Sequence, residues 1–224
     1  MSTKQTEMAT EQITAKRLIM RSGRSAVLLD GVLSSDECRE LTKRAKQKGY
    51  EEALVNIGGG KQSSIPDLRS GDRCIIDDEA LAGDLFHRIQ PYLQKTKGLK
   101  AEKKLIGLNE RLRFLAYKRG GYFKPHTDGS YSRPDGSASS YMTVMIYLND
   151  GDADFEGGRT LFLDEQTWTP WANKIEHAII PKPGRVLIFD HDMFHAGEEV
   201  ISGTKICIRT DVMYSWPAHE PQGK

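Results

Sequence analysis

The pattern of apolar and polar residues predicts a first helix near residue 35. Ser34 and Glu37 have the spacing of a capping box, in which each side chain bonds a free backbone N–H of the other residue. The helix is expected to run to Lys48, because Gly49 is a residue type that commonly ends helices. The residues expected on its apolar side are Cys38, Leu41 and Ala45.

A second helix is predicted after residue 78. Asp78 can cap it, and Pro91 predicts that it ends or bends near its last turn. Its apolar stripe consists of Leu81, Leu85, Phe86, Ile89 and Leu93. Before the first helix, residues 24–29 predict a short strand that ends in the turn Asp30-Gly31.

From residue 105 onward the pattern changes to short apolar runs separated by turn residues, which is typical of β-strands. The predicted strands are 111–117, 141–148, 157–163, 175–180, 185–189 and 205–214. Helices followed by strands predict an α+β, mainly β fold. We expect a jelly-roll-like double sheet buttressed by the N-terminal helices.

Four regions follow from these patterns. Residues 1–16 are polar and predict a disordered tail. Residues 17–104 are expected to form a helical support region, within which the Gly/Ser/Pro-rich stretch 58–71 is expected to be a flexible loop. The strands of 105–216 form the predicted core, and 217–224 are a C-terminal tail.

The charge balance restricts the kinds of partner. The chain has 224 residues with 32 basic and 31 acidic side chains, so its net charge of +1 indicates neither nucleic acid nor an anionic membrane as a partner. No apolar run approaches the roughly 20 residues of a membrane span, and the N-terminus lacks the apolar core of a secretory signal. Three widely spaced cysteines indicate reduced thiols. A cytoplasmic or nuclear location is expected.

The segment 123–131 contains the candidate chemistry. In an extended chain His126 and Asp128 point to the same face, so an imidazole and a carboxylate can meet at one point. His195 can supply a third ligand, and His191 is a rival for that position. Two histidines and one carboxylate with open positions are typical of non-haem Fe(II) oxygenases. Alone, the pair also fits a surface turn in which Asp128 and Gly129 cap a hairpin.

The order of several motifs resembles that of a known family. Residues 112–214 are similar to the 2-oxoglutarate- and Fe(II)-dependent dioxygenases, specifically the prolyl-4-hydroxylase-like branch. The motifs that carry the resemblance are Arg113–Tyr117, His126-Thr127-Asp128, Tyr147-Leu148-Asn149, Gly157–Thr160, Pro183–Phe189, His195, Gly203-Thr204-Lys205 and Arg209.

The resemblance implies a double-stranded β-helix of the cupin type with His126, Asp128 and His195 as catalytic iron ligands. It also implies a 2-oxoglutarate site with Lys205 or Arg209 as the anchor of the distal carboxylate. Tyr117 and Tyr147 align with residues of that site. The implied oxidoreductase uses Fe(II), 2-oxoglutarate and O2, with ascorbate as a further cofactor, and it hydroxylates an unactivated C–H bond while releasing succinate and CO2.

The substrate is the least determined part. Residues 130–137 predict a lid over the iron, in which Tyr131 and Arg133 are candidate substrate residues. From the earlier loop, Arg69, Asp72 and Arg73 can reach the same mouth, and Trp168 and Trp171 are candidates for a substrate groove. We expect a prolyl residue in a protein as substrate. A free amino acid or another small molecule is an alternative, and so is a non-catalytic jelly-roll binding module.

Overall fold

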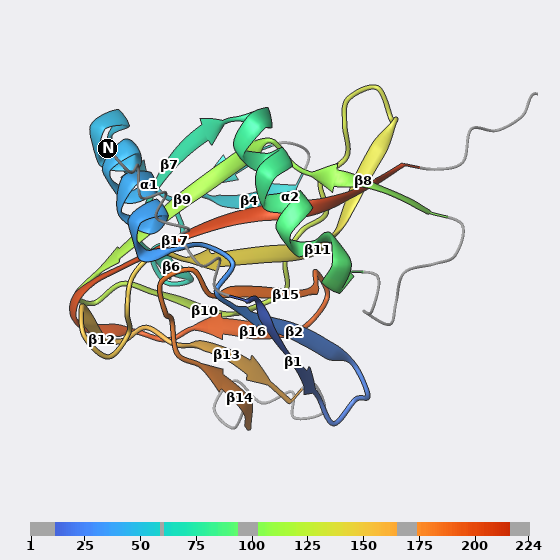
Figure 1. Cartoon of the computed structure of the whole chain (residues 1–224). Helices are drawn as coiled ribbons and strands as arrows, with labels where there is room; N and C mark the ends of the chain where they lie inside the picture. Colours follow the sequence, from blue (N-terminus) through green and yellow to red (C-terminus); the bar gives the residue numbers. More distant parts are fainter. Residues whose placement is uncertain (1–11, 59–60, 94–102, 165–173, 216–224) are drawn as a thin grey trace, which may run out of the picture.

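The computed structural model describes residues 12–58, 61–93, 103–164 and 174–215. Two antiparallel sheets face each other across the middle of the molecule (Figure 1). The large sheet has ten strands in the order β1-β2-β15-β11-β17-β9-β7-β3, with β8 and β12 also paired to β17. Its strands are β1 (Thr14–Ile19), β2 (Ser25–Asp30), β3 (Glu51–Glu52), β7 (Asp72–Asp77), β8 (Lys104–Leu108), β9 (Arg111–Lys118), β11 (Ala138–Tyr147), β12 (Phe155–Gly157), β15 (Val186–Asp190) and β17 (Val200–Ser215).

The small sheet has five strands in the order β14-β13-β16-β10-β6. They are β6 (Arg69–Ser70), β10 (Tyr122–His126), β13 (Thr160–Leu163), β14 (Ile175–Ile179) and β16 (His195–Gly197). A separate hairpin joins β4 (Val55–Gly58) to β5 (Lys61–Ser63). Two facing antiparallel sheets confirm the predicted double-stranded β-helix, a mainly β fold with few helices.

Both predicted helices are present, as α1 (Ser35–Lys48) and α2 (Glu79–Leu93). The capping box of α1 forms, since the Glu37 backbone N–H donates to Ser34 Oγ and the Ser34 N–H donates to the Glu37 carboxylate. Asp78 caps α2 by accepting from the Leu81 N–H at 2.9 Å. The helix continues past Pro91 and ends at Leu93. Neither helix is long and apolar enough to cross a membrane.

The large sheet separates two apolar cores. The buried faces of α1 and α2 pack on its outer face, against residues such as Phe114 and Ile208. Its inner face meets the small sheet, where Leu115 and Cys207 belong to a second core. Neighbouring residues of one strand thus point to opposite cores, which is the period of two of a β-strand. The three cysteines are buried and unpaired, as expected.

The expected division into a helical support region and a β-core needs correction. Within residues 17–104, β2 pairs with β15 and β7 pairs with β9, so both strands belong to the large sheet. The expected tail is also too long, because β1 begins at Thr14 and pairs with β2. The expected loop 58–71 contains β5 and β6. These strands are short and polar, and only their pairing partners stabilise them as strands.

Candidate active site

The inner face of β17 carries the polar side chains around which the site is built. Lys205, Cys207, Arg209 and Asp211 alternate with residues of the opposite face, such as Ile206 and Ile208 of the outer core, and all four line a cavity of about 600 Å³ between the sheets. The pairing register places Tyr117 of β9 opposite Lys205 and Arg113 of β9 opposite Arg209. One strand with period two therefore supplies four chemically distinct groups to the same cavity.

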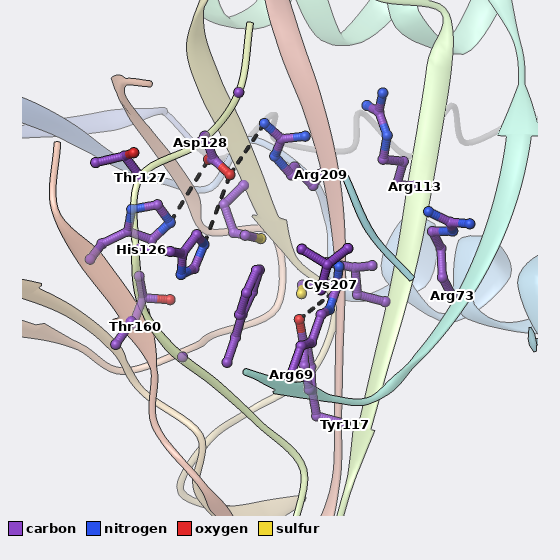
Figure 2. Close-up of a pocket in the computed structure, with 18 of the residues that line it drawn as sticks. Arg69, Arg73, Arg113, Tyr117, His126, Thr127, Asp128, Thr160, Cys207 and Arg209 are labelled. Atoms are coloured by element: carbon purple, nitrogen blue, oxygen red, sulfur yellow. Dashed lines mark hydrogen bonds and ion pairs between the residues drawn. The ribbon is translucent and has the colours of Figure 1, made fainter. Parts of the chain in front are cut away.

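Three candidate ligands meet at one end of this cavity. His126 ends β10 directly opposite His195, which begins β16. Asp128 Oδ1 lies 3.9 Å from His126 Nε2, and Asp128 Oδ2 lies 3.8 Å from His195 Nε2. One ligand atom from each residue lies within 4.8 Å of the other two, which is a spacing that could hold a metal ion. Figure 2 shows the Asp128 carboxylate beside the ring of His126.

The backbone sets the orientation of both imidazoles. His126 Nδ1 lies 2.7 Å from the carbonyl oxygen of Lys124, and His195 Nδ1 lies 2.9 Å from that of Met193. A carbonyl only accepts, so each Nδ1 carries the proton and each Nε2 presents its lone pair to the site. Burial lowers the pKa of His126 to about 3 and also lowers the pKa of His195. Both rings are therefore neutral at pH 7, as a metal ligand must be.

Asp128 is held as a carboxylate. Burial is the largest influence on its pKa and would favour the neutral form, but the Arg209 guanidinium at 3.3 Å, the two histidines and the Thr143 hydrogen bond together outweigh it and lower the pKa of Asp128. Thr143 of β11 donates to Oδ2. Two neutral imidazoles and one carboxylate form a donor set that fits Fe(II), so His126, Asp128 and His195 are the residues that would hold the ion.

His191, the rival ligand, is engaged elsewhere. Its Nδ1 lies 2.9 Å from Thr143 Oγ1, and its Nε2 lies 2.9 Å from Ser140 Oγ. Its carbonyl oxygen accepts from the Asp128 N–H at 2.7 Å. His191 and Thr143 therefore orient Asp128 through hydrogen bonds to its backbone N–H and to its carboxylate. Thr143 was not foreseen, and its signal in the sequence is a single threonine within an apolar run of β11.

Lys205 lies deeper in the cavity. It is buried, its Nζ donates to the Gly158 carbonyl at 2.7 Å, and it lies 5.7 Å and 5.6 Å from the ring centres of Tyr117 and Tyr147. Among the described residues no carboxylate oxygen lies within 4.0 Å of Nζ. Burial lowers the pKa of Lys205, so an anion bound beside it would relieve the cost of its buried charge.

Arg209 differs from Lys205 in already having anionic partners. Its NH2 group lies 3.3 Å from Asp128 and 3.2 Å from Asp211. Asp211 also accepts from Arg113 at 3.2 Å. Arg209 thus holds the carboxylates beside the histidines, whereas the charge of Lys205 remains available to a ligand.

The other candidate residues separate into two groups. Tyr117, Tyr131 and Arg73 line the cavity. Tyr147 does not line the cavity itself, but its hydroxyl donates to the lining residue Thr160 at 2.7 Å. Arg133 does not line the cavity, because its guanidinium pairs with Glu110 at 2.9 Å.

The expected lid is part of a hairpin. Tyr131 exchanges two hydrogen bonds with Ser140 of β11, and Ser132 bridges Ser139. Pairing with β11 therefore holds the first residues of this segment at the edge of the cavity, where Tyr131 is a lining residue. Trp168 and Trp171, the candidates for a substrate groove, lie outside the described residues.

The fold and the donor set define a class of protein. Residues 112–210 match the family model of the 2OG-Fe(II) oxygenase superfamily. The match includes all three candidate ligands and Lys205. This chain is similar to the 2OG-Fe(II) oxygenases of the prolyl-4-hydroxylase-like kind, as its sequence motifs indicated.

The relatives include one curated protein and several solved structures. The chain is 26% identical over 197 residues to "Probable prolyl 4-hydroxylase 6" of Arabidopsis thaliana, and the match covers 80% of this chain and 66% of that protein. The viral collagen prolyl hydroxylase of Paramecium bursaria Chlorella virus-1, solved as a 2OG complex, is 22% identical with a TM-score of 0.56, over 87% of this chain and 98% of the other.

Two further structures have the same fold. A prolyl-4-hydroxylase of Pseudomonas putida is 15% identical with a TM-score of 0.57, over 88% of this chain and 95% of that one. A prolyl hydroxylase of Trichoplax adhaerens, solved with a peptide fragment of the hypoxia inducible factor, is 16% identical with a TM-score of 0.58, over 85% of this chain and 83% of that one. At these identities the structures establish the fold alone.

Proposed function

We propose that this protein is an Fe(II)- and 2-oxoglutarate-dependent dioxygenase that hydroxylates an unactivated C–H bond and converts 2-oxoglutarate to succinate and CO2. The observation that carries the proposal is the pairing of two features in one cavity. A cluster of His126, Asp128 and His195 lies at one end, and the buried cation of Lys205 lies on the wall. A 2-oxo acid with a distal carboxylate suits both.

The chain's own residues have separate tasks in this proposal. The three ligands hold the ion, and Arg209 with Thr143 keeps Asp128 ionised and oriented. Lys205 binds the distal carboxylate of 2-oxoglutarate, with the aromatic rings of Tyr117 and Tyr147 around it. Apolar lining residues such as Leu115 and Met145 limit the access of water. The bound iron supplies the activation of O2, and ascorbate serves to keep it reduced.

A prolyl residue in a protein is the first candidate for the substrate. It is supported by the curated relative and by solved relatives whose names describe prolyl hydroxylases. A small molecule with an acidic group is the second candidate. It is favoured by the arginines Arg69, Arg73 and Arg113, which line the same cavity as the ligand cluster.

The test is release of labelled CO2 from 2-oxoglutarate labelled at C1, with Fe(II) and the purified protein, alongside Mn(II) binding measured by calorimetry. Asp128→Ala should weaken Mn(II) binding by roughly 100-fold or more and abolish CO2 release, because one of three ligands is lost. Asp135→Ala, which removes an exposed carboxylate of the neighbouring hairpin, is the matched control and should change neither.

The alternative of a non-catalytic jelly-roll module gives the opposite result. It predicts that the wild-type protein releases no CO2 from 2-oxoglutarate, not even by uncoupled turnover in the absence of a substrate. It also predicts the same Mn(II) affinity in the wild type and in Asp128→Ala. Either result would refute the enzymatic proposal.

A further inference from the structure

We infer that Arg69 and Arg73 form a binding site for a carboxylate of the substrate, separate from the lysine that receives 2-oxoglutarate. This inference rests on the proposed function and deepens it by stating the chemical class of the substrate. Throughout, Arg69 and Arg73 are called the arginine pair.

The two arginines come from different sheets. Arg69 lies on β6 opposite Phe123 of β10, and Arg73 lies on β7 opposite Leu115 of β9. Both line the cavity that also contains the ligand cluster. Figure 2 shows Arg73 beside Arg113, on the opposite side of the cavity from His126.

The arginine pair has hydrogen-bonding capacity to spare. The Nε atoms of Arg69 and Arg73 are buried and have no hydrogen-bond partner among the described residues. Arg69 donates from NH2 to the Tyr117 hydroxyl at 3.1 Å, and its guanidinium lies 4.8 Å from the centre of the Phe123 ring. Buried donors without partners are rare in folded proteins, so each one indicates a missing acceptor.

The charge of the pair is also poorly compensated. Arg73 is only 6% exposed, and it donates to the neutral Gln62 at 3.2 Å. Its one carboxylate neighbour among the described residues is Glu51 at 3.5 Å, whose side chain is 70% exposed and therefore strongly screened by water. Arg69 has no ion pair with a described carboxylate within 4.0 Å.

The carboxylates of the cavity do not neutralise the arginine pair. Five cationic side chains line it (Arg69, Arg73, Arg113, Lys205 and Arg209) against three carboxylates (Asp128, Glu198 and Asp211). Asp128 and Asp211 already pair with Arg209, and Glu198 accepts from Arg159 at 2.7 Å. Apart from that of Lys205, two positive charges of the cavity are therefore not compensated by its carboxylates. A buried unpaired charge is costly.

The strand register places Arg73 apart from Lys205. Arg73 of β7 pairs with Leu115 of β9, which in turn pairs with Cys207 of β17. Arg73 is therefore two strands from β17, a distance of about 10 Å at the usual strand spacing. Lys205 lies one row further along, opposite Tyr117. A ligand of Lys205 thus leaves Arg73 free, and the planar arginine fork suits a second carboxylate.

The test uses paired probes that differ in one charge. One pair is a capped peptide with a single proline between two glutamates, and its counterpart with two glutamines. The other pair is L-proline and L-prolinamide. Binding is measured by calorimetry on protein loaded with Mn(II) and 2-oxoglutarate, which does not turn over, and hydroxylation is measured with Fe(II) as a gain of 16 Da.

For at least one of the two pairs of probes, the wild-type protein should bind the probe with the carboxylate about tenfold more tightly than its neutral counterpart, as expected for a charge-assisted hydrogen bond. The preference should weaken as salt is raised from about 50 to about 500 mM, because salt screens the charges. The pair that shows the preference identifies the source of the carboxylate, either a peptide side chain or a free acid.

In Arg73→Gln and in Arg69→Gln, this preference should fall to within about twofold, while 2-oxoglutarate still binds. Arg39→Gln on α1, which removes an exposed arginine paired with Asp36, is the matched control and should keep the full preference. Thermal unfolding verifies that each variant folds. If Arg73→Gln does not fold, Arg73→Lys is used in its place. This variant keeps the charge but loses the planar guanidinium with its paired donors, and it should reduce the preference partially.

Equal binding of charged and neutral probes by the wild type, including no binding of either, overturns the inference. A preference that persists in both glutamine variants overturns it as well. Failure of the proposed function looks different, because it abolishes CO2 release from 2-oxoglutarate whether or not carboxylate probes are preferred.

Discussion

At the scale of single residues, the two cations on β17 differ above all in their partners. Lys205 donates to a backbone carbonyl, whereas Arg209 pairs with two carboxylates. The sequence placed both residues on one strand face and left open which of them anchors 2-oxoglutarate. The contacts favour Lys205 as the anchor and give Arg209 the task of keeping Asp128 ionised.

This difference predicts opposite phenotypes for two matched variants. Lys205→Gln should weaken 2-oxoglutarate binding by roughly 10- to 100-fold and leave Mn(II) binding nearly unchanged, because it removes one charge-assisted contact. Arg209→Gln should weaken Mn(II) binding more than 2-oxoglutarate binding, because Asp128 loses its cation. Calorimetric titration of each variant with both ligands decides the matter, and equal effects in the two variants would contradict the assignment.

At the scale of elements, one tight approach joins the start of β15 to the loop before α1. Gly184 has φ of +74°, and its carbonyl accepts from the Val32 N–H at 3.1 Å. A Cβ at this position would collide with the Leu33 backbone. The Pro183-Gly184 motif therefore holds the helical layer against the sheet that carries the site.

Gly184→Ala should lower the free energy of unfolding by about 3 kcal/mol or more, because a steric collision adds to the backbone strain. Gly136→Ala is the matched control, since Gly136 has φ of +72° but a Cβ there would meet nothing within 4 Å. It should cost only about 1–2 kcal/mol. Urea unfolding of both variants measures the difference, and equal losses would show that the contact with Leu33 is unimportant.

The capping box of α1 gives stability a specific dependence on pH. Hydrogen bonding to Arg88, supported by Ser34, lowers the pKa of Glu37 to about 2. A depressed pKa means that this contribution is present above the ordinary value of 4.5 and is lost as pH falls from 4.5 toward 2.

Glu37→Gln keeps the capping geometry but removes the charge. It should destabilise the protein by roughly 0.5–1 kcal/mol at pH 7, because the pair with Arg88 is partly exposed, and the difference from wild type should shrink toward pH 2. Glu40→Gln on the exposed side of α1 is the control and should have little effect at either pH. Chemical denaturation at pH 7 and near pH 2.5 tests this, and a difference that grows on acidification would contradict it.

At the scale of the whole molecule, the catalytic region depends on the N-terminal region. Strands β2 and β7 pair with β15 and β9, and the buried faces of α1 and α2 cover the outer core. The match to the family model begins only at residue 112, so in this chain the large sheet is completed by strands outside the matched region.

A chain of residues 105–224 should therefore fail to fold. It would expose the apolar outer face of the large sheet and leave β9 and β15 as unpaired edges. Circular dichroism without a cooperative unfolding transition, or recovery only in aggregates, is the expected result. A folded fragment that binds Mn(II) as tightly as the full chain would show that the two regions are independent domains.

The sequence by itself determined the local features. Capping residues and apolar spacing predicted both helices, and the family motifs predicted the double-stranded β-helix. The spacing of His126 and Asp128 indicated a shared face because strand periodicity is a local property. The sequence could not show that β1, β2 and β7 join the core sheet, since pairing depends on distant partners.

Only the tertiary structure decided how the groups of the site are used. Thr143 and His191 lie behind Asp128, and Arg133 pairs with Glu110 instead of lining the cavity. Such roles depend on distances and burial between residues far apart in the chain, where charge and hydrogen bonding are decided by three-dimensional neighbours. The shared face of His126 and Asp128 is thus a property of the sequence, whereas the approach of His195 and the charge balance around the three residues are properties of the fold.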